Sequence, residues 1–300
     1  MKDMREYLRR FAGPANRRVS DLLKGWSSLW RRPDIAIFHD FVPPPYGGGN
    51  QFLLALRREF ELRGVAVEEN YISPSARACL YNSFNFDFDR LRGLKRSNCV
   101  MVHRVDGPIG AYRGWDDGTD AKILAINHEL ADVTIFQSLY SQQKLLDMGM
   151  KFTSPVVIHN AADPRIFHPN GRRPFERHRK TRLISSSWSD NPNKGGPFYA
   201  KLEALLDWNR FEYTFVGRTQ TTFERIKTFP AVPSQELASV LRSHDIYLTA
   251  SRNDPCSNSV IEALQCGLPC LYLQSGGHAE LVGEAGFAFS NAILGAVHSM

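Results

Sequence analysis

Short apolar runs alternate with stretches of helical periodicity along the chain after residue 33. The apolar runs predict buried strands at 34–39, 98–102, 133–136, 155–158, 181–187, 211–216, 246–250, 270–273 and 287–289, and a further strand near Val65. Apolar positions three and four residues apart predict helices at 50–63, 120–131, 139–148, 198–208 and 234–242. Residues 73–97 alternate aromatic with Asn and Asp positions and fit either a strand or a loop. This alternation of strands and helices predicts an α/β fold with parallel sheets.

The alternation is interrupted by a polar, basic stretch at 168–180 that contains proline. Such a composition is typical of a linker between domains. A chain of 300 residues also suits two domains better than one. We therefore predict an N-terminal domain at 33–170 and a C-terminal domain at 171–300.

The most informative polar loop follows the predicted strand at 246–250. It carries Asp254, and the small polar residues at 257–259 predict a helix start because their side chains cap free amide groups. Glu262 falls inside that helix. Ligands of open parallel sheets bind at the carboxyl ends of the strands, so a binding site is expected here. A carboxylate such as Glu262, beside a sugar or ribose, can accept two hydroxyl hydrogen bonds.

This stretch resembles the donor-site signature of the retaining glycosyltransferases of family 4 (glycosyl transferases group 1), which have the GT-B fold. The matching residues are Asp254, Glu262-Ala263, Cys266-Gly267-Leu268-Pro269 and Gly276-Gly277-His278-Ala279-Glu280. The first position is usually Glu, so Asp254 is one methylene shorter. The resemblance implies two Rossmann-like domains whose parallel sheets face a central cleft. It also implies that Glu262 accepts hydrogen bonds from the ribose hydroxyls and that Asp254 contacts the donor sugar.

The N-terminal half offers two further polar segments. Gly48 and Gly49 lie in a glycine loop between a strand and a helix, which suits either a tight turn or the approach of backbone amides to a phosphate or sugar. The loop resembles the corresponding glycine loop of the family. His103, Arg104 and Asp106 follow the strand at 98–102. The resemblance implies that Asp106 or His103 assists the acceptor hydroxyl; alternatively, both residues cap the strand and neutralise Arg104.

A nucleotide-sugar has a diphosphate leaving group, which needs cations and amide groups to stabilise its charge. Lys194 and Arg218 each follow a strand of the C-terminal half, and both are candidates, although each also fits a solvated loop charge. The family pairs this Lys with an Arg about five residues earlier, where this chain has serines. The predicted donor-binding residues are Gly48, Gly49, Lys194, Arg218, Ser257, Asn258, Ser259 and Glu262; the catalytic candidates are Asp106, His103 and Asp254. No metal site or other cofactor is expected.

The net charge is concentrated at the N-terminus. Residues 1–32 contain nine Lys or Arg and three acidic residues, and nine minus three equals the net charge of +6 of the whole chain. The balanced remainder gives no indication of nucleic-acid binding. This basic amphipathic segment fits the surface of an anionic membrane or a helix packed on the protein's own core. No apolar run reaches about eighteen residues, no signal peptide is evident, and five unpaired cysteines favour a cytoplasmic location.

The predicted function is transfer of a sugar, with retention of configuration, from a nucleotide-sugar to a saccharide or lipid-linked saccharide in cell-surface polysaccharide synthesis. The alternatives are a sugar-nucleotide epimerase of the same architecture and a catalytically degenerate module that binds sugar nucleotides. Domains of this kind usually end in long helices, whereas few residues follow the strand at 287–289. The C-terminal domain is therefore expected to be truncated or to close unusually.

Overall fold

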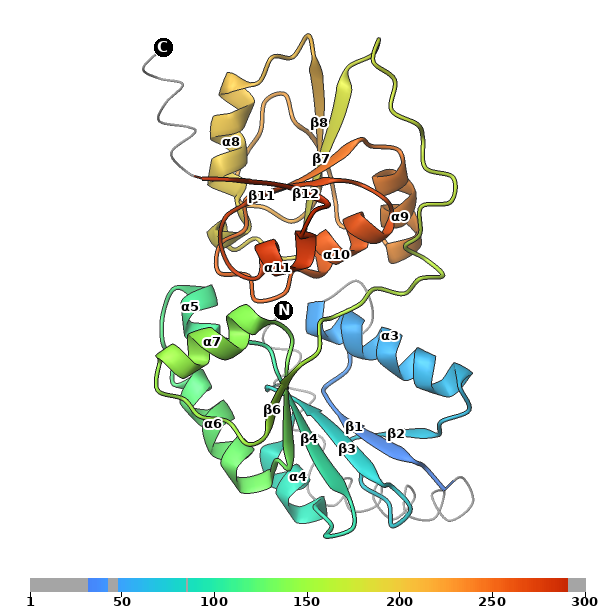
Figure 1. Ribbon diagram of the computed structural model, residues 1–300, viewed down its shortest axis with the longest axis vertical. Coiled ribbons are helices and arrows are strands. Elements are labelled where there is room, and N and C mark those ends of the chain that lie inside the picture. The colour runs from blue at the N-terminus through green and yellow to red at the C-terminus, as the bar shows by residue number, and fades with distance from the viewer. Residues whose placement is uncertain (1–31, 43–47, 85, 291–300) are drawn as a thin grey trace, which may run out of the picture.

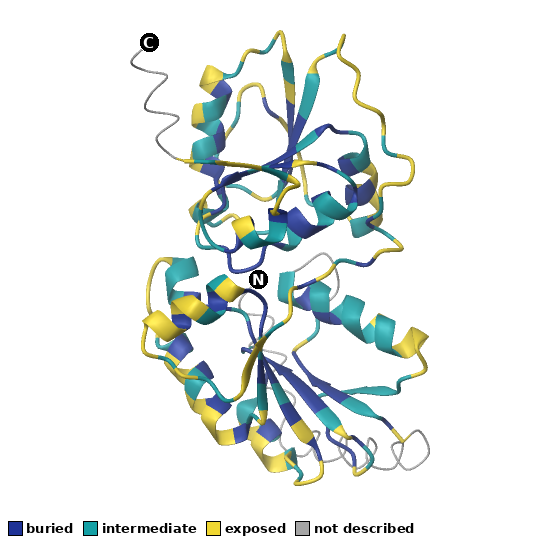
Figure 2. Cartoon of the chain, in the orientation of Figure 1, coloured by how far each residue is buried: buried dark blue, intermediate teal, exposed yellow. Residues whose placement is uncertain are grey.

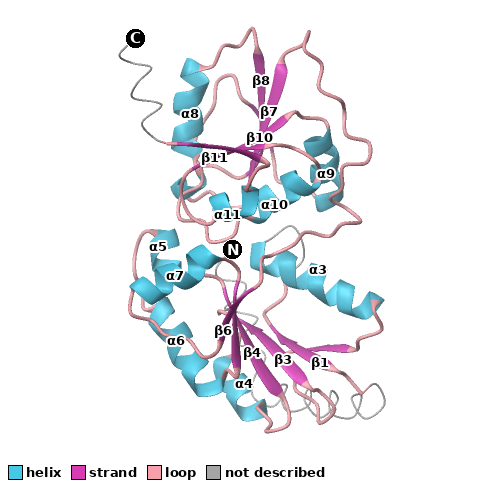
Figure 3. Cartoon of the chain, in the orientation of Figure 1, coloured by secondary structure: helices cyan, strands magenta, loops and turns pink. Residues whose placement is uncertain are grey.

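The computed structural model describes residues 32–42, 48–84 and 86–290, which form two α/β domains stacked one above the other (Figure 1). Each domain is built on a six-stranded sheet in which every hydrogen-bonded pair of strands is parallel. Helices cover the faces of both sheets (Figure 3). The predicted α/β architecture with two parallel sheets is confirmed. The basic segment predicted at 1–32 lies, except for Arg32, outside the described residues.

The N-terminal sheet has the strand order β2-β1-β3-β4-β5-β6. Its strands are β1 (Ile35–Phe38), β2 (Val67–Glu69), β3 (Ala78–Asn82), β4 (Val100–Val105), β5 (Val133–Phe136) and β6 (Pro155–Val157). Its helices are α3 (Gly48–Leu62), α4 (Phe88–Leu94), α5 (Ile109–Arg113), α6 (Thr119–Leu130) and α7 (Leu139–Asp147). Alternate residues of β1 and β4 point to opposite faces. One face packs on Leu53 of α3, and the other packs on α4, α6 and α7.

The C-terminal sheet has the order β12-β11-β10-β7-β8-β9, which is the doubly wound order of dinucleotide-binding folds. Its strands are β7 (Thr181–Ser187), β8 (Phe211–Gly217), β9 (Lys227–Phe229), β10 (Ile246–Thr249), β11 (Cys270–Leu273) and β12 (Gly286–Phe289). Its helical elements are the 3-10 turn η1 (Pro192–Lys194), α8 (Gly196–Leu205), α9 (Ser234–Arg242), α10 (Asn258–Gln265) and α11 (His278–Val282). Burial is greatest along the central strands (Figure 2).

The strand order determines where a ligand can bind. Chain connections run in opposite directions on either side of the β1–β3 pair and on either side of the β7–β10 pair. A crevice opens at such switch points, beyond the carboxyl ends of the strands. The carboxyl ends of both sheets face the boundary between the domains, so the two crevices combine into one cleft.

Two parts of the chain differ from the prediction. The segment 73–97 contains strand β3 and helix α4, which the mixture of aromatic and Asn or Asp residues concealed. Strand β4 continues to Val105, so His103 and Arg104 belong to the strand and not to the loop after it. No helix within the described ranges is long and apolar enough to cross a membrane.

The domains contact each other directly across the cleft. Glu280, on α11, accepts hydrogen bonds from the amides of Leu139 and Tyr140 at 2.8 and 3.0 Å. Asn258, on α10, donates from Nδ2 to the Gly48 carbonyl at 2.8 Å. The first contact caps the N-terminus of α7 with a carboxylate, which suits the positive end of a helix. These contacts hold the two sheet edges against each other around the cleft.

Candidate functional site

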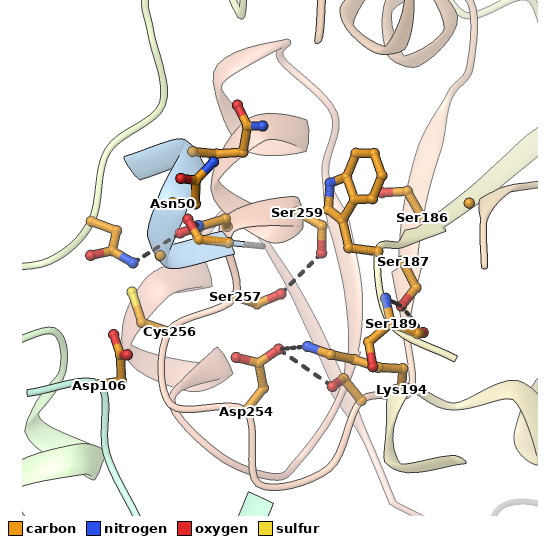
Figure 4. A pocket seen from close by; sticks show the side chains of 18 of the residues that line it. Asn50, Asp106, Ser186, Ser187, Ser189, Lys194, Asp254, Cys256, Ser257 and Ser259 are labelled. Carbon is orange, nitrogen blue, oxygen red and sulfur yellow. Dashed lines mark hydrogen bonds and ion pairs between the residues drawn. The ribbon is translucent and has the colours of Figure 1, made fainter. Parts of the chain in front are cut away.

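The cleft between the domains has a volume of about 1240 Å³ and is lined from both sides (Figure 4). The N-terminal wall includes the ends of β1, β3 and β4, the start of α3 and helix α5. The C-terminal wall includes the ends of β7, β8 and β10, the loop before α10 and the first turns of α10. Every predicted site residue except His103 lines this cleft: Asp106, Asp254, Gly48, Gly49, Lys194, Arg218, Ser257, Asn258, Ser259 and Glu262.

Lys194 and Asp254 form an ion pair on the C-terminal wall, with Lys194 Nζ 2.7 Å from Asp254 Oδ2. Lys194 ends the short η1 turn after β7, and Asp254 lies in the loop after β10. Ser251 Oγ donates to the same carboxylate oxygen at 3.4 Å. The ring of Tyr112, from α5 of the other domain, lies 5.1 Å from Lys194 Nζ. The site therefore holds a lysine between a carboxylate and an aromatic face.

Both members of this pair are ionised. Burial alone disfavours the charge of Lys194, but the charge of Asp254 outweighs it and holds the pKa of Lys194 above its usual value. Burial likewise opposes the ionisation of Asp254. The charge of Lys194, with a smaller contribution from His278, outweighs that effect and holds the pKa of Asp254 below its usual value. The pair is stable at neutral pH and remains adjacent to the open cleft.

Glu262 presents the opposite case. It lies one turn into α10 and lines the cleft, yet no hydrogen bond or ion pair joins its carboxylate to another described residue. Burial raises the pKa of Glu262 to about 8, and no neighbouring charge offsets this. An unpaired carboxylate in a desolvated position is costly, and a ligand that donates hydrogen bonds would relieve the cost.

The start of α10 provides backbone donors beside these carboxylates. Ser257 is the N-cap residue, but its hydroxyl is paired with Ser259 Oγ at 3.0 Å and does not cap the helix. The first amides of a helix lack partners within the helix and carry a partial positive charge. The Asn258 side chain is engaged elsewhere, because it spans the cleft to Gly48 and accepts from Asn160 Nδ2 at 2.9 Å.

Gly48 and Gly49, predicted in a loop, begin helix α3 in the structure, and the Asn258 contact joins this first turn to α10. A Cβ atom on Gly48 would lie 3.0 Å from Asn258 Nδ2. A side chain there would therefore require the Asn258 side chain, and its hydrogen bond to the Gly48 carbonyl, to shift. Gly49 is more open, since its Cβ would come no nearer than 3.7 Å to Asn82 Nδ2. The close approach of the backbones explains a glycine at position 48 better than at position 49.

Arg104 anchors the N-terminal wall. It is 2% exposed and pairs with Asp106, and it donates to Asn82, Gln137 and Asn160 at 2.7, 2.9 and 3.0 Å. Its guanidinium also lies 4.6 Å from the centre of the Phe52 ring. Asp106 extends from this network into the cleft. The structure thus combines the two interpretations of this segment: Asp106 neutralises Arg104 and also faces the ligand space.

His103 does not reach the cleft. Adjacent residues of a strand point to opposite faces, so His103 lies on the α6 side of the sheet while Arg104 lies on the α3 side. The ring of His103 is fully buried, stacks on Tyr81 at 4.3 Å and has Nδ1 3.0 Å from Asn127 Nδ2. Burial lowers the pKa of His103 to about 3, so the ring is neutral. We assign His103 to the core and not to the reacting groups.

Arg218 lies at the end of β8, exposed and beside the cleft. Its amide donates to the Ser187 carbonyl at 2.8 Å, which fixes the loop after β8 against the loop after β7. Gly217 permits this junction, because a Cβ there would lie only 1.9 Å from the same carbonyl oxygen. The position where the family usually has an arginine is occupied by Ser189, which also lines the cleft. Arg218 therefore provides a cation at the same end of the cleft.

Comparisons with known proteins agree with this geometry. Residues 197–297 match the family model described as glycosyl transferases group 1. A search of curated protein sequences returned no match. The matched residues include Asp254, the start of α10 and Glu262, which belong to the C-terminal wall of the cleft, whereas Lys194 and the end of β7 precede the match.

Solved structures extend the likeness to both domains. Sucrose-phosphate synthase from Thermosynechococcus elongatus aligns with a TM-score of 0.67 at 15% identity, over 89% of each chain. HepE from Anabaena, in complex with UDP-glucose, aligns with a TM-score of 0.64 at 14% identity, over 88% of this chain and 89% of its own. Starch synthase IV from Arabidopsis thaliana, bound to ADP and acarbose, aligns with a TM-score of 0.60 at 8% identity, over 87% and 88%. The predicted GT-B fold of two Rossmann-like domains is confirmed.

Two residues of the site escaped the sequence analysis. His39, at the end of β1, is 3% exposed and lines the cleft, and neither ring nitrogen has a hydrogen-bond partner among the described residues. Tyr112 lies on α5, a helix too short to give a periodic signal. A polar residue at the carboxyl end of the predicted strand 34–39 was a usable signal for His39. None marked Tyr112, because its contact with Lys194 joins distant parts of the chain.

Proposed function

We propose that the protein is a glycosyltransferase that moves a sugar from a nucleotide-sugar to a saccharide or lipid-linked saccharide, with retention of configuration at the anomeric carbon. One observation carries the proposal. The Lys194–Asp254 ion pair and the unpaired carboxylate of Glu262 face one cleft between two parallel sheets, and both carboxylates lie in the segment that matches the group 1 family model. A cation beside amide donors suits a diphosphate, and a carboxylate without a partner suits a pair of hydroxyl donors.

On the donor side, Glu262 accepts hydrogen bonds from the two ribose hydroxyls. Lys194 and the first amides of α10 bind the diphosphate, and Arg218 provides further positive charge from the end of β8. Asp254 accepts from the hydroxyls of the transferred sugar. Because Lys194 already pairs with Asp254, the donor is held by two groups whose relative position is fixed before it arrives. Such pre-organisation lowers the reorganisation needed during the reaction.

In the reaction, the bond between the anomeric carbon and the phosphate oxygen breaks, and its electron pair passes to the diphosphate. The acceptor oxygen forms the new bond to the anomeric carbon on the same face, and its proton passes to the departing diphosphate. Lys194 and the α10 amides stabilise the developing negative charge. Such electrostatic stabilisation of the transition state is usually the largest single contribution to the rate enhancement of an enzyme. We propose that this charge is met without a metal ion, so EDTA leaves the rate unchanged.

On the acceptor side, the exposed part of Asp106 assists the acceptor hydroxyl. The neutral ring of His39, whose pKa is lowered by burial, offers one donor and one acceptor, which matches a sugar hydroxyl better than an anion. HepE and starch synthase IV were solved with UDP-glucose and with ADP plus acarbose, respectively. These ligands support a nucleotide-sugar donor and a saccharide acceptor in this fold. A role in cell-surface polysaccharide synthesis at the cytoplasmic face of the membrane, with residues 1–32 on anionic lipid, completes the proposal.

The test is nucleotide binding followed by transfer. UDP-, GDP-, ADP- and dTDP-sugars are titrated by calorimetry, without metal, into wild type, Glu262→Gln and the matched control Glu284→Gln, an exposed carboxylate away from the cleft. One nucleotide class should bind to wild type and the control and lose affinity in Glu262→Gln. Release of nucleoside diphosphate should then require a saccharide acceptor. The absence of binding by every donor would overturn the proposal. Epimerised donor without an acceptor would indicate an epimerase, and binding without turnover a degenerate module.

A further inference from the structure

The short helix α5 of the N-terminal domain is held at its two ends by different domains. At its start, the amides of Ile109 and Gly110 donate to the two carboxylate oxygens of Asp120 at 2.8 and 3.0 Å. Asp120 is 4% exposed and belongs to α6 of the same domain. At its other end, two carbonyl groups of α5 accept hydrogen bonds from the C-terminal domain.

Those two bonds come from asparagines next to the ion pair. Asn193 Nδ2 donates to the Tyr112 carbonyl at 3.0 Å, and Asn253 Nδ2 donates to the Ala111 carbonyl at 3.4 Å. Asn193 immediately precedes Lys194, and Asn253 immediately precedes Asp254. The last carbonyls of a helix lack partners within the helix, so these amides satisfy groups that otherwise need water. Each charged residue of the pair is thus one residue away from a contact with α5.

The two loops are also joined to each other. The Asn193 carbonyl accepts from the Arg252 amide at 2.7 Å. Asn253 has a φ of +52°, a left-handed conformation that Asn tolerates better than most residues, and its amide donates to Ser275 Oγ at 3.0 Å. Tyr140, on α7, donates its hydroxyl to Asn253 Oδ1 at 3.4 Å. The side chains that contact α5 thus belong to two loops that are hydrogen-bonded to each other and that carry both charges.

Side chains continue this contact beyond the main chain. The Tyr112 ring lies against the ammonium group of Lys194. Beside α5, a Cβ on Gly107 would lie 2.9 Å from the ring atoms of Pro255, so the loop after Asp254 fits against a residue without a side chain. The contact surface therefore extends from Gly107 to Tyr112 on one domain and covers both loops of the ion pair on the other.

We propose that α5 is a positioning element, which fixes the Lys194–Asp254 pair in its productive geometry only while the two domains are in contact. This inference rests on the proposed transferase function and concerns the same site. Asn193, Asn253 and Tyr112 act through Lys194 and Asp254 and do not touch the reacting atoms. The free energy of the domain contact is thereby converted into alignment of the groups that meet the diphosphate and the sugar. A displacement of about 1 Å in such a site lowers the rate by about a hundredfold.

The first experiment compares the double variant Asn193→Ala/Asn253→Gly with wild type and with the control Asn209→Ala, whose side chain is exposed on the C-terminal domain. Gly at position 253 keeps the left-handed backbone accessible. The double variant should lose ten- to a hundredfold in kcat, while its calorimetric Kd for the nucleoside diphosphate changes less than threefold. Tyr112→Phe should keep most of the rate, because the ring remains, and Tyr112→Leu should not.

A second measurement does not depend on turnover. The acetylation rate of Lys194 by acetic anhydride is determined by peptide mass spectrometry, with the exposed Lys201 of the same chain as reference. Lys194 should react several-fold faster in the double variant, because its ammonium is no longer held against Asp254 and Tyr112. An unchanged labelling rate would overturn the positioning role, and so would a kcat and a nucleotide affinity that both fall together with the melting midpoint. If wild type neither bound a nucleotide-sugar nor transferred a sugar, the proposed function would be refuted. The labelling rate of Lys194 would still decide whether α5 positions this residue.

Discussion

The charged side chains of the two cleft walls differ in how many partners they have within the protein. On the N-terminal wall, Arg104 is surrounded by one carboxylate, three side-chain amide oxygens and an aromatic ring. On the C-terminal wall, Lys194 has one carboxylate partner and Glu262 has none among the described residues. The charge of the first wall is satisfied by the protein, whereas that of the second is left in part for a ligand. We infer that the N-terminal wall is a prebuilt frame and that the C-terminal wall is the part that responds to the donor.

The largest expected effect is a loss of stability when the Arg104 network of the N-terminal wall, the prebuilt frame, is disrupted. Arg104→Met would leave Asp106 without its partner and would remove the Arg104 hydrogen bonds from three buried amide oxygens, of which only that of Gln137 keeps another donor, Asn160 Nδ2. Breaking a buried ion pair costs about 3–5 kcal/mol, and the lower end applies here because Asp106 reaches the cleft. We expect this loss in the free energy of unfolding measured in urea. Arg177→Met, at an exposed arginine of the linker, should change it by less than about 0.5 kcal/mol. Equal stabilities for the two variants would contradict the role of Arg104 as a frame.

The next largest effect concerns the ion pair of the other wall. Lys194→Met removes the cation expected to meet the diphosphate, and loss of one such stabilising group lowers kcat by about 10²–10³-fold. The unfolding free energy should also change its pH dependence. The depressed pKa of Asp254 contributes stability above the unfolded pKa of about 3.9, and this stability is lost as the pH falls through the folded value. Without Lys194 that acid-side loss should be smaller. A variant with full transfer activity would refute the assignment of Lys194.

The contrast between the walls also explains what the sequence could predict. The donor wall is assembled locally: β11 occupies the predicted residues 270–273, and Asp254, the α10 start and Glu262 lie within nine residues of one another. Its pattern is therefore visible in one stretch of chain. The frame is assembled from distant segments, since Arg104 binds residues 22, 33 and 56 positions away. Partners at such separations leave no trace in local periodicity.

The failures of the prediction have the same cause. The sequence pattern predicts that the strand at 98–102 ends before His103, because His and Arg are typical of loops. In the structure both are buried in β4, by Tyr81 and Asn127 on one face and by Asn82 and Gln137 on the other. Strand β9 was missed because its three residues are exposed and give no apolar run. Polar residues inside a strand, and strands at a sheet edge, depend on neighbours that the local pattern does not contain.

A smaller effect is expected in the pH dependence of nucleotide affinity, through Glu262 of the C-terminal wall. Burial raises the pKa of Glu262 to about 8, so at pH 7 most molecules hold it neutral. Ribose hydroxyls donate best to the ionised form, so nucleotide binding should release a proton. The association constant should therefore rise with pH by up to about tenfold per unit below pH 8 and level off above it. Calorimetry in buffers of different ionisation enthalpy measures both the affinity and the proton release.

The control for this prediction is Glu262→Gln, which should bind more weakly and without that pH dependence. Stability should show the opposite trend. The folded state of wild type holds a proton that the unfolded chain releases near pH 4.3, so wild type loses stability as the pH rises from there to about 8. The free energy of unfolding of Glu262→Gln should not fall over this pH range, because Gln does not ionise. An affinity in wild type that is flat between pH 6 and 8 would show that Glu262 already has a partner or does not meet the donor.

The smallest expected effect lies at the rim of the cleft, where the walls meet. Glu280 accepts from two α7 amides and from His159 Nε2 at 3.1 Å. His159 is 45% exposed, and ion pairs this open contribute about 0–1 kcal/mol. We expect His159→Gln to lower the free energy of unfolding, measured by calorimetry, by less than about 1 kcal/mol. Glu280→Ala should lower it by about 1–3 kcal/mol because two α7 amides are left unpaired. If the His159 variant cost as much as the Glu280 variant, the domain contact would depend on charge pairing and not on the capping of α7.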